Sequence, residues 1–333
     1  MRILVDAMGG DNAPVAIVKG CVDAINSENG YDITLIGNES IINDVLSNED
    51  YDKGRIDILH TSETITNEDK PTIAIKTKKD SSMVVGFNML KKNEGDAFLS
   101  AGNTGAMLTA SLLLLGRMKG VLRPALGAIV PTKGGETLLI DAGLNSAVRP
   151  ESYVQFAHFG TEYMRALYGL ENPKVGLVNI GHEDGKGTPE VKEANELLKV
   201  AHIDYAGNIE GHDIINGKAK IVVCDGFVGN ILLKFFEGTG MYFLNSLKGM
   251  LKKNILSMMA GIILKKDIKE FFRPLNPDIV GGAPILGVNG LVMKSHGSSK
   301  PLTIKNVISK TAKLVKADIK GHIRMSLEGE VNG

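Results

Sequence analysis

Residues 98–116, FLSAGNTGAMLTASLLLLG, begin as a short apolar run, pass through six small residues and resume as an apolar stretch with helical spacing. The run before the break has the length of a buried strand, and the stretch after it has the length of a helix. Glycines at positions 102 and 105 allow the backbone to approach a ligand closely. The stretch therefore predicts a strand, a glycine-rich loop and a helix in succession, which is the repeating unit of a parallel α/β sheet.

Short β-rich runs of this kind recur along the chain, each followed by a glycine-rich turn and most by a helical period. They are RILVDA (2–7), DITLIG (32–37), DAFLSA (96–101), KVGLVNIG (174–181), IVVCDG (221–226) and GLVMKS (290–295). This alternation predicts one α/β domain over residues 1–333, with a doubly wound, mostly parallel sheet between two layers of helices (α/β/α). Residues 231–273 lack strand signals, and we interpret them as a helical excursion from that domain.

Composition limits the possible functions. The 333 residues are 43% hydrophobic, and 38 basic residues balance 38 acidic ones. The chain is long enough to bury a large core, and its balanced charge disfavours nucleic acid as the main ligand. Because no apolar run has the length of a signal peptide or a spanning helix, we expect a cytoplasmic protein. Cys21 and Cys224 lack the spacing of metal ligands, which predicts two reduced core residues and no metal site.

Four other strand ends carry loops with the same chemistry as residues 100–105. VDAMGGDNAP contains Gly10 and Asp11, VNIGHEDGKGTPE contains Lys186, VCDGFVGN contains Asp225 and Asn230, and MKSHGSSKP contains Lys294, Ser295, His296, Ser298 and Ser299. In an open parallel sheet, ligands bind outside the carboxyl ends of the strands, where loops offer backbone N–H groups. Five such loops at one edge of the sheet predict a single crevice for an anionic ligand.

The loops match no standard nucleotide motif. AMGGDNAP lacks the spacing of a dinucleotide-binding loop, and no P-loop pattern occurs. There is also no nucleophile elbow and no convincing Cys–His pairing, so an acyl-enzyme is not expected. The pattern favours direct transfer between two bound reactants, with Lys186, Asn103, Asn230, His296 and oriented amides available where negative charge develops.

Taken together and in order, the motifs closely resemble the phosphate acyltransferase family of bacterial phospholipid synthesis. The motifs are VDAMGGDNAP, SAGNTGA, GRMKGVLRPAL (116–126), VNIGHEDGKG, GNIEGHD (207–213), CDGFVGN and HGSS. The resemblance implies a fold similar to that of the phosphotransacetylases and the isocitrate and isopropylmalate dehydrogenases, usually as a homodimer. It implies acyl transfer from acyl-[acyl-carrier protein] to inorganic phosphate without a cofactor. A membrane acyltransferase then moves the acyl group of the resulting acyl phosphate to glycerol 3-phosphate.

The resemblance and the residue chemistry assign roles to the same side chains. Lys186, which matches the family's Gly-Lys-Gly lysine, would pair with phosphate or the oxyanion, and Asn230 would donate to the carbonyl oxygen. His296 would bind substrate or protonate the leaving thiolate. The residues expected to bind phosphate or substrate are Gly10, Asp11, Asn103, Thr104, Gly105, Asp225, Ser298 and Ser299. Structural alternatives stay open, because a loop lysine is often merely solvated and Asn, Asp and Ser are common turn and helix-cap residues.

Three positions depart from the family pattern. Ala147 and His182 stand where an acid is usual, and Asn12 stands where a histidine is usual. An essential acid at position 147 or 182, or an essential histidine at position 12, is therefore excluded for this protein.

The helical excursion has a basic, amphipathic character. Residues 245–273 carry seven basic residues against two acidic ones, and Leu244, Leu247, Leu251, Ile255, Met258 and Ile262 recur at helical spacing. Such a helix suits an anionic membrane surface or the acidic carrier protein. We expect these contacts from Lys252, Lys253, Leu256, Ile262, Lys265 and Lys266. Alternatively, the apolar stripe is buried in the core or in a dimer interface. Glycines at 238, 240, 249 and 261 favour a hinged hairpin over one rigid helix.

The leading hypothesis is an acyl-carrier-protein-dependent phosphate acyltransferase, at the inner face of the cell membrane. A phosphotransacetylase that uses acyl-coenzyme A would need the same chemistry with another carrier. A dehydrogenase of similar fold is disfavoured by the missing dinucleotide motif. A membrane-associated scaffold with a vestigial pocket is the alternative outside catalysis.

Overall fold

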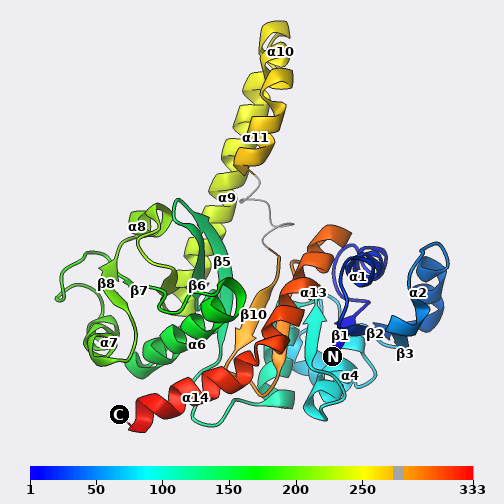
Figure 1. The fold of residues 1–333 in the computed structure, drawn as a ribbon, viewed down its shortest axis with the longest axis horizontal. Coiled ribbons are helices and arrows are strands. Elements are labelled where there is room, and N and C mark those ends of the chain that lie inside the picture. The colour runs from blue at the N-terminus through cyan, green and yellow to red at the C-terminus, as the bar shows by residue number, and fades with distance from the viewer. Residues whose placement is uncertain (273–280, 333) are drawn as a thin grey trace.

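The described part of the chain, residues 1–272 and 281–332 of a computed structural model, contains one sheet of 11 strands (Figure 1). Its order is β3-β2-β1-β4-β11-β10-β5-β6-β9-β7-β8. The strands are β1 (Arg2–Asp6), β2 (Asp32–Gly37), β3 (Ile56–His60), β4 (Ala97–Ser100), β5 (Ala125–Thr132), β6 (Gly135–Ile140), β7 (Val175–Val178), β8 (Tyr205–Ile209), β9 (Ile221–Val223), β10 (Ala283–Leu286) and β11 (Leu291–Lys294). All six runs identified in the sequence are strands of this sheet.

Helices cover both faces of the sheet, which confirms the predicted α/β/α architecture. They are α1 (Val15–Ser27), α2 (Glu39–Leu46), α3 (Pro71–Thr77), α4 (Ser82–Lys91), α5 (Thr104–Ala110), α6 (Pro150–Tyr168), α7 (Pro189–Val200), α8 (Gly211–Asn216), α9 (Gly226–Leu251), α10 (Ile255–Ile263), α11 (Lys265–Phe272), α13 (Pro301–Lys316) and α14 (Ile319–Asn332). The largest core cluster joins one face to α1, α6, α13 and α14, whereas the opposite face packs against α3, α4 and α5 in one half and against α8 and α9 in the other. Cys21 and Cys224 are both buried, as predicted.

The sheet is mostly parallel, but its two halves run in opposite directions. Three successive pairs, β11–β10, β10–β5 and β5–β6, are antiparallel, and every other pairing is parallel. As a result, β6, β7, β8 and β9 run opposite to β1, β4 and β11. The prediction that all five glycine-rich loops leave one edge of the sheet is therefore wrong, because three reversals of direction separate the loops after β7 and β9 from the others.

Although the two halves run in opposite directions, the strand register places the carboxyl ends of β4, β11 and β6 at nearly the same height along the strands. Ser100 and Lys294, the last residues of β4 and β11, are register partners. When the register is followed through β10 and β5, Ile140 at the end of β6 lies level with Met293 of β11. The loops of the two halves thus begin within a residue of the same level and depart in opposite directions.

Residues 231–272 form helices that stand away from the sheet as a stalk, which consists of the C-terminal part of α9 with α10 and α11. Figure 1 shows α11 beside α9 and α10 at the far end. The chain turns at residues 252–254, where the Asn254 side chain accepts a hydrogen bond from the Ser257 N–H at 2.8 Å and caps α10. The turn contains no glycine, although Gly261 lets α10 lie close to Leu251. Arg273, the last residue of the predicted excursion, lies outside the described residues.

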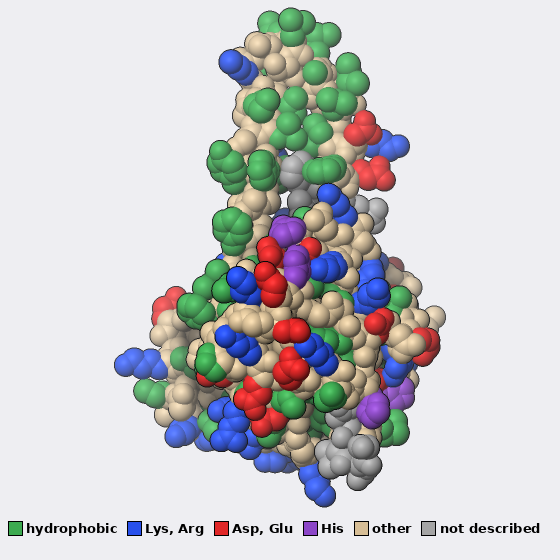
Figure 2. Space-filling model, turned by 90° about the vertical axis from the view of Figure 1, so that its left-hand side faces the viewer, with side chains coloured by type: hydrophobic (Ala, Val, Ile, Leu, Met, Phe, Trp, Pro, Cys, Tyr) green, Lys and Arg blue, Asp and Glu red, His purple; other side chains and the backbone are tan. Residues whose placement is uncertain are grey.

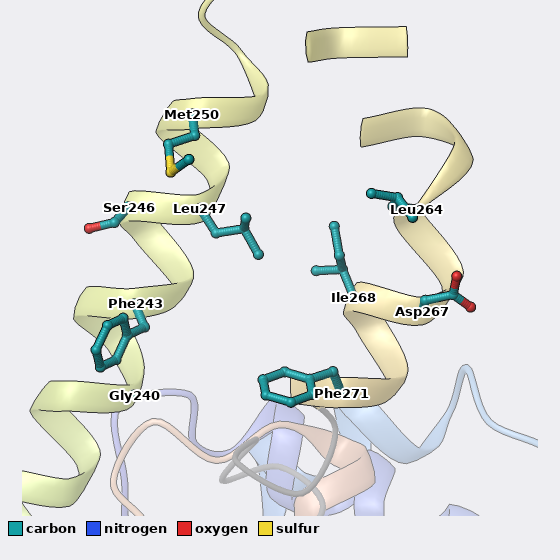
Figure 3. Close-up of a pocket in the computed structure, with 9 residues that line it drawn as sticks. All are labelled: Gly240, Phe243, Ser246, Leu247, Met250, Leu264, Asp267, Ile268 and Phe271. Carbon is teal, nitrogen blue, oxygen red and sulfur yellow. The ribbon is translucent and has the colours of Figure 1, made fainter. Parts of the chain in front are cut away.

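The stalk carries a large amount of exposed apolar surface. A groove of about 780 Å³ separates α9 from α11, and Figure 3 shows Leu247, Ile268 and Phe271 projecting into it. Apolar side chains continue to the tip, as Figure 2 shows. Among them, Ile255 is 77% exposed and Leu256 78% exposed. The stripe predicted from the sequence is therefore not buried in the core of this chain at its α10 end.

Two glycines of α9 provide a test of how this helix is attached to the sheet. A Cβ on Gly229 would lie 1.8 Å from the Asp141 carbonyl oxygen, whereas a Cβ on Gly238 would meet nothing within 4 Å. We expect Gly229→Ala to lower the free energy of unfolding by about 1–3 kcal/mol or more, because the helix must move off the strand end. Gly238→Ala is the matched control and should raise that free energy by up to about 1 kcal/mol. Urea unfolding measures both, and equal effects would contradict the close packing.

Candidate active site

In the first half of the sheet, a buried carboxylate joins the loops after β1 and β4. Asp6 accepts hydrogen bonds from the Ser82 hydroxyl at 2.6 Å and the Ser100 hydroxyl at 2.7 Å. Burial raises the pKa of the Asp6 carboxyl, although these hydrogen bonds oppose the shift. A Cβ on Gly9 would lie 2.5 Å from Asp6 Oδ2 and 2.8 Å from the Gly102 nitrogen. The two glycine-rich loops are thus pressed together, which requires glycine at position 9.

The loop after β11 is attached to the loop after β1. The Asp11 N–H donates to the Gly297 carbonyl oxygen at 2.8 Å. The Asn12 amide donates to the carbonyl oxygens of Ser298 at 3.0 Å and Ser299 at 3.2 Å. Gly10, with a φ of 109°, makes the turn that this approach needs. The structure therefore brings Gly10, Asp11, Ser298 and Ser299 together, and Asn12 has a structural role where the family usually has a histidine.

The side chains of His296 and Ser298 are accessible to a ligand, whereas that of Ser299 is buried. Nδ1 of His296 accepts from the Ser298 N–H at 3.2 Å and lies 2.8 Å from the Ser298 hydroxyl, which places the ring proton of the neutral imidazole on Nε2. The Ser299 hydroxyl is buried, donates to the His296 carbonyl oxygen at 2.6 Å and lies 2.7 Å from the Ser295 hydroxyl. Ser298 and His296 are exposed, whereas Ser299 holds the loop in shape.

Most of the residues that we expected to bind substrate in the loop after β4 stabilise the loop itself. The Asn103 oxygen caps α5 by accepting from the Ala106 N–H at 3.0 Å, and its amide donates to the Thr66 carbonyl at 2.9 Å. Thr104 is exposed at the first position of α5. Gly105 lies against Pro71, since a Cβ there would be 2.7 Å from Pro71 Cγ. Of these residues, only Thr104 presents a side chain to solvent.

In the second half of the sheet, Asp141 organises the loop after β6. Its buried carboxylate accepts from the N–H groups of Leu126 at 3.0 Å, Gly143 at 3.1 Å, Leu144 at 2.9 Å and Asn145 at 2.7 Å, and from the Asn145 amide at 2.8 Å. Burial raises the pKa of the Asp141 carboxyl, and these donors oppose the shift. The Asn145 carbonyl then accepts from the Gly226 N–H at 2.7 Å, which fixes the start of α9.

The first turns of α9 separate the roles of Asp225 and Asn230. Asp225 is the helix cap, since its carboxylate accepts from the Val228 N–H at 2.8 Å. Asn230 lies in the second turn, exposed, where it covers Gly143; a Cβ on Gly143 would lie 3.4 Å from Asn230 Oδ1. Its side chain makes no hydrogen bond within residues 1–272 and 281–332. The helix-cap alternative is therefore wrong for Asn230, whose amide is available to a ligand.

Lys186 is exposed on a well-fixed loop after β7. The Asn179 amide donates to the Lys186 carbonyl at 3.1 Å, and the Lys186 N–H donates to the Glu183 carbonyl at 3.1 Å. The Asn208 amide also donates to that Glu183 carbonyl, at 3.2 Å. In the part of the chain that is described, the Lys186 ammonium has no hydrogen bond or ion pair. The backbone is held while the charged group remains unpaired.

His182, on the same loop, makes a contact with a carboxylate that the sequence did not reveal. Its Nε2 lies 2.6 Å from Asp213 Oδ2, and Lys218 lies 3.4 Å from the same oxygen. Partial burial by itself raises the pKa of Asp213, but hydrogen bonds from His182, the Glu210 N–H and Lys218 outweigh it and lower that pKa to about 2. This contact anchors the Lys186 loop to α8, so the departure at position 182 has a structural role.

Two residues of the site, Asp141 and Lys294, stand directly at the ends of strand runs, which is a sequence signal for a site residue. Asp141 directly follows the strand run LLI, as Asp6 follows RILV, and Lys294 ends the run GLVMK without a role having been assigned to it. The described residues contain no group of three or more His, Cys, Asp or Glu side chains placed to hold a metal ion.

Comparison with known proteins identifies the class. A family model described as fatty acid synthesis protein matches residues 1–321. A phosphate acyltransferase of Acetivibrio thermocellus is 56% identical over 97% of this chain and 96% of its own length. A solved phosphotransacetylase from Streptococcus pyogenes has a TM-score of 0.61 at 14% identity, covering 95% of this chain and 94% of its own. A branched-chain phosphotransacylase from Enterococcus faecalis has a TM-score of 0.58 at 16% identity, covering 95% and 99%.

The fold is that of the phosphotransacetylases. The family match is more specific than this class, because it extends over nearly the whole chain at high identity. The chain belongs to the phosphate acyltransferase family. It is therefore an acyltransferase rather than a dehydrogenase or a scaffold.

The contact between His182 and Asp213 provides a test of the Lys186 loop. Because the folded-state pKa of Asp213 is below its ordinary value of 3.8, the contacts of its carboxylate with His182, the Glu210 N–H and Lys218 together stabilise the protein above about pH 4 and progressively less as the pH falls toward 2. We expect Asp213→Asn to cost about 1 kcal/mol at pH 7 and to lose this effect near pH 2. Amide hydrogen exchange should become faster at residues 181–187. Asp204→Asn, at an exposed position before β8, is the control, and equal exchange in the two variants would contradict the anchoring role.

Proposed function

We propose that this protein transfers a long-chain acyl group from acyl-[acyl-carrier protein] to inorganic phosphate, for phospholipid synthesis. The observation that carries the proposal is the pair of unpaired polar groups at neighbouring strand ends, the Lys186 ammonium after β7 and the Asn230 amide after β9. The backbone that carries each group is held by hydrogen bonds. Preorganised donors of this kind stabilise the negative charge that develops when a nucleophile attacks a carbonyl group. The names of its relatives support phosphate as the acyl acceptor.

The reaction proceeds by direct attack, without an acyl-enzyme. An oxygen of hydrogen phosphate forms a bond to the thioester carbonyl carbon, and the carbonyl oxygen becomes an oxyanion. The C–S bond then breaks, the proton of hydrogen phosphate passes to the leaving sulfur, and the products are an acyl phosphate and a free thiol. Lys186 pairs with the phosphate or the oxyanion, and the Asn230 amide donates to the oxyanion. His296, with its proton on Nε2, binds substrate or delivers the proton to the sulfur.

The other predicted residues divide into two groups in this scheme. The exposed ones, Asp11, Thr104 and Ser298, together with the backbone N–H groups near Gly10, are offered to phosphate or substrate. The second group, Asn103, Gly105, Asp225 and Ser299, shapes the loops that present them.

Removing either donor should slow the transfer. We expect Lys186→Ala and Asn230→Ala to reduce kcat by about 10²- to 10³-fold, because each removes a donor to charge that develops in the transition state. The measurement is phosphate-dependent loss of the thioester from palmitoyl-[acyl-carrier protein], with the acyl phosphate trapped by hydroxylamine.

Two controls make this test decisive. Lys192→Ala removes an exposed lysine of α7 and should leave kcat unchanged. Palmitoyl-coenzyme A, assayed in parallel, distinguishes the two carriers. Faster turnover with coenzyme A would favour the phosphotransacetylase alternative, and full activity of a folded Lys186 or Asn230 variant would remove that residue's role.

We also propose that the stalk holds the enzyme at the inner face of the cell membrane, near a membrane acyltransferase that consumes its product. Leu256 and Ile262 on α10 are 78% and 73% exposed. Lys252 and Lys253 lie in the turn before α10, and Lys265 and Lys266 begin α11. Apolar side chains flanked by lysines are the pattern of a helix that lies in an anionic lipid interface. No described helix is both long enough and apolar enough to cross a membrane.

The same stalk offers surface to two protein partners. The lysines suit the acidic carrier protein, and the apolar groove between α9 and α11 suits a second copy in the homodimer that the family resemblance implies. The tip is the part that we assign to the lipid.

Liposome flotation tests the membrane contact. Changing both Leu256 and Ile262 to Asp should abolish flotation with vesicles that contain phosphatidylglycerol, because charged side chains cannot enter the interface. Val200→Asp is the control, since Val200 is 78% exposed on α7, outside the stalk. Equal flotation of both folded variants and the unchanged protein would remove the membrane claim.

A further inference from the structure

Lys294 occupies a central position that the proposed mechanism does not yet use. It is the last residue of β11 and the register partner of Ser100 on one side and Ala283 on the other. Because side chains alternate along a strand, Lys294 shares a sheet face with Val292, which packs in the cluster under α4 and α5. Lys294 therefore emerges between the two halves of the molecule, at the level where both sets of loops begin.

A polar stripe on α9 lies across from Lys294. Asn230, Lys234 and Glu237 are spaced by four and three residues, which places them on one side of the helix. Val228, Leu232 and Phe236 pack against the sheet, so the stripe turns away from that contact. Lys234 and Glu237 form an ion pair at 2.7 Å. Leu233, next to Lys234 in the helix, packs against the cluster that contains Val292, so this part of α9 lies over the sheet face that Lys294 shares. One helical turn thus separates the Asn230 amide from the residues that face the Lys294 ammonium.

The ammonium of Lys294 lacks an anionic partner. It is part-buried, and its one hydrogen bond within the described residues is to the Ser295 carbonyl oxygen at 3.1 Å. No described carboxylate forms an ion pair with it, and Glu237 is paired with Lys234. Burial lowers the pKa of Lys294, the charge of Lys234 lowers it further, and Glu237 opposes the shift. A part-buried cation beside a second cation is costly unless an anion joins them.

We infer that Lys294 is a phosphate-binding catalytic residue, whose ammonium holds the attacking phosphate between the loop after β11 and the Asn230 face of α9. This inference rests on the proposed function. In it, the exposed Lys186 and the part-buried Lys294 divide the work, with Lys294 positioning the nucleophile. Phosphate bound there would relieve the repulsion between Lys294 and Lys234 and would lie beside the amide assigned to the oxyanion.

The test is the phosphate dependence of acyl-[acyl-carrier protein] turnover in Lys294→Met and Lys294→Arg. Loss of a charged hydrogen bond should raise the KM for phosphate by about 10- to 100-fold in Lys294→Met, with a smaller change in the KM for the acyl donor. Lys294→Arg should restore part of the affinity and move the alkaline limb of the pH profile to higher pH, because arginine keeps its charge. Lys313→Met, at an exposed position on α13, is the control.

A binding measurement covers the case in which Lys294→Met folds poorly. Inorganic phosphate is added at 10 mM, a concentration of about the Kd of a weak anion site. It should raise the Tm of the protein without substitutions and of Lys313→Met, and should raise the Tm of Lys294→Arg by less. An unchanged phosphate KM in an active Lys294→Met, or equal Tm shifts in all variants, overturns the inference. If the protein without substitutions is inactive with every thioester, the proposed function is overturned instead. Failure of the inference and failure of the proposed function are therefore distinguishable.

Discussion

The carboxylate of Asp141 is the contact on which the path of α9 depends. Five donors converge on it from the start of β5, the loop after β6 and the side chain of Asn145. Burying a carboxylate without such donors would cost several kcal/mol, so the loop adopts the one conformation that supplies them. That conformation aims the Asn145 carbonyl at the first N–H of α9, and Gly229 then lies directly on the Asp141 carbonyl. The path of α9, and with it the stalk, follows from this anchor.

The reversal of strand direction in the middle of the sheet explains why one helix has so large a role. In a uniformly parallel sheet, all the ligand-binding loops would meet at one edge. Here β10 and the β5–β6 hairpin turn the second half over, and its loops leave toward the opposite side. The first turns of α9 pack over the sheet, and Leu233 joins the core cluster that contains Val292 of β11. The helix thus supplies the proximity that the strand order alone would have prevented.

In the stalk, the sequence pattern predicted the helices correctly but did not predict where the chain turns. Helical periodicity predicted the helices of residues 231–272, and glycine content indicated a hinge. The turn falls instead at residues 252–254, where Asn254 caps the next helix, since a cap supplies a hydrogen bond that glycine lacks. Gly238, Gly240 and Gly249, which we interpreted as hinge signals in the sequence, lie inside α9 without interrupting it.

The sequence by itself determined the fold class, six of the strands, the family and the loops that carry polar groups, because these depend on local periodicity and on short motifs. It did not reveal the β5–β6 hairpin, although the glycine pair at 134–135 is a turn signal, since we assigned no strand to the runs on either side of it. Only the tertiary structure decided which polar residues are available. Asn103, Asp225 and Ser299 are engaged by neighbouring backbone, whereas the Asn230 and Lys186 side chains have no partner among the described residues and Lys294 has only the Ser295 carbonyl oxygen. Each of these contacts is local, but the loop conformations that allow them are held by residues far apart in the chain, namely Thr66, Asn12 and Asn145. Spacing along the sequence does not specify those long-range contacts.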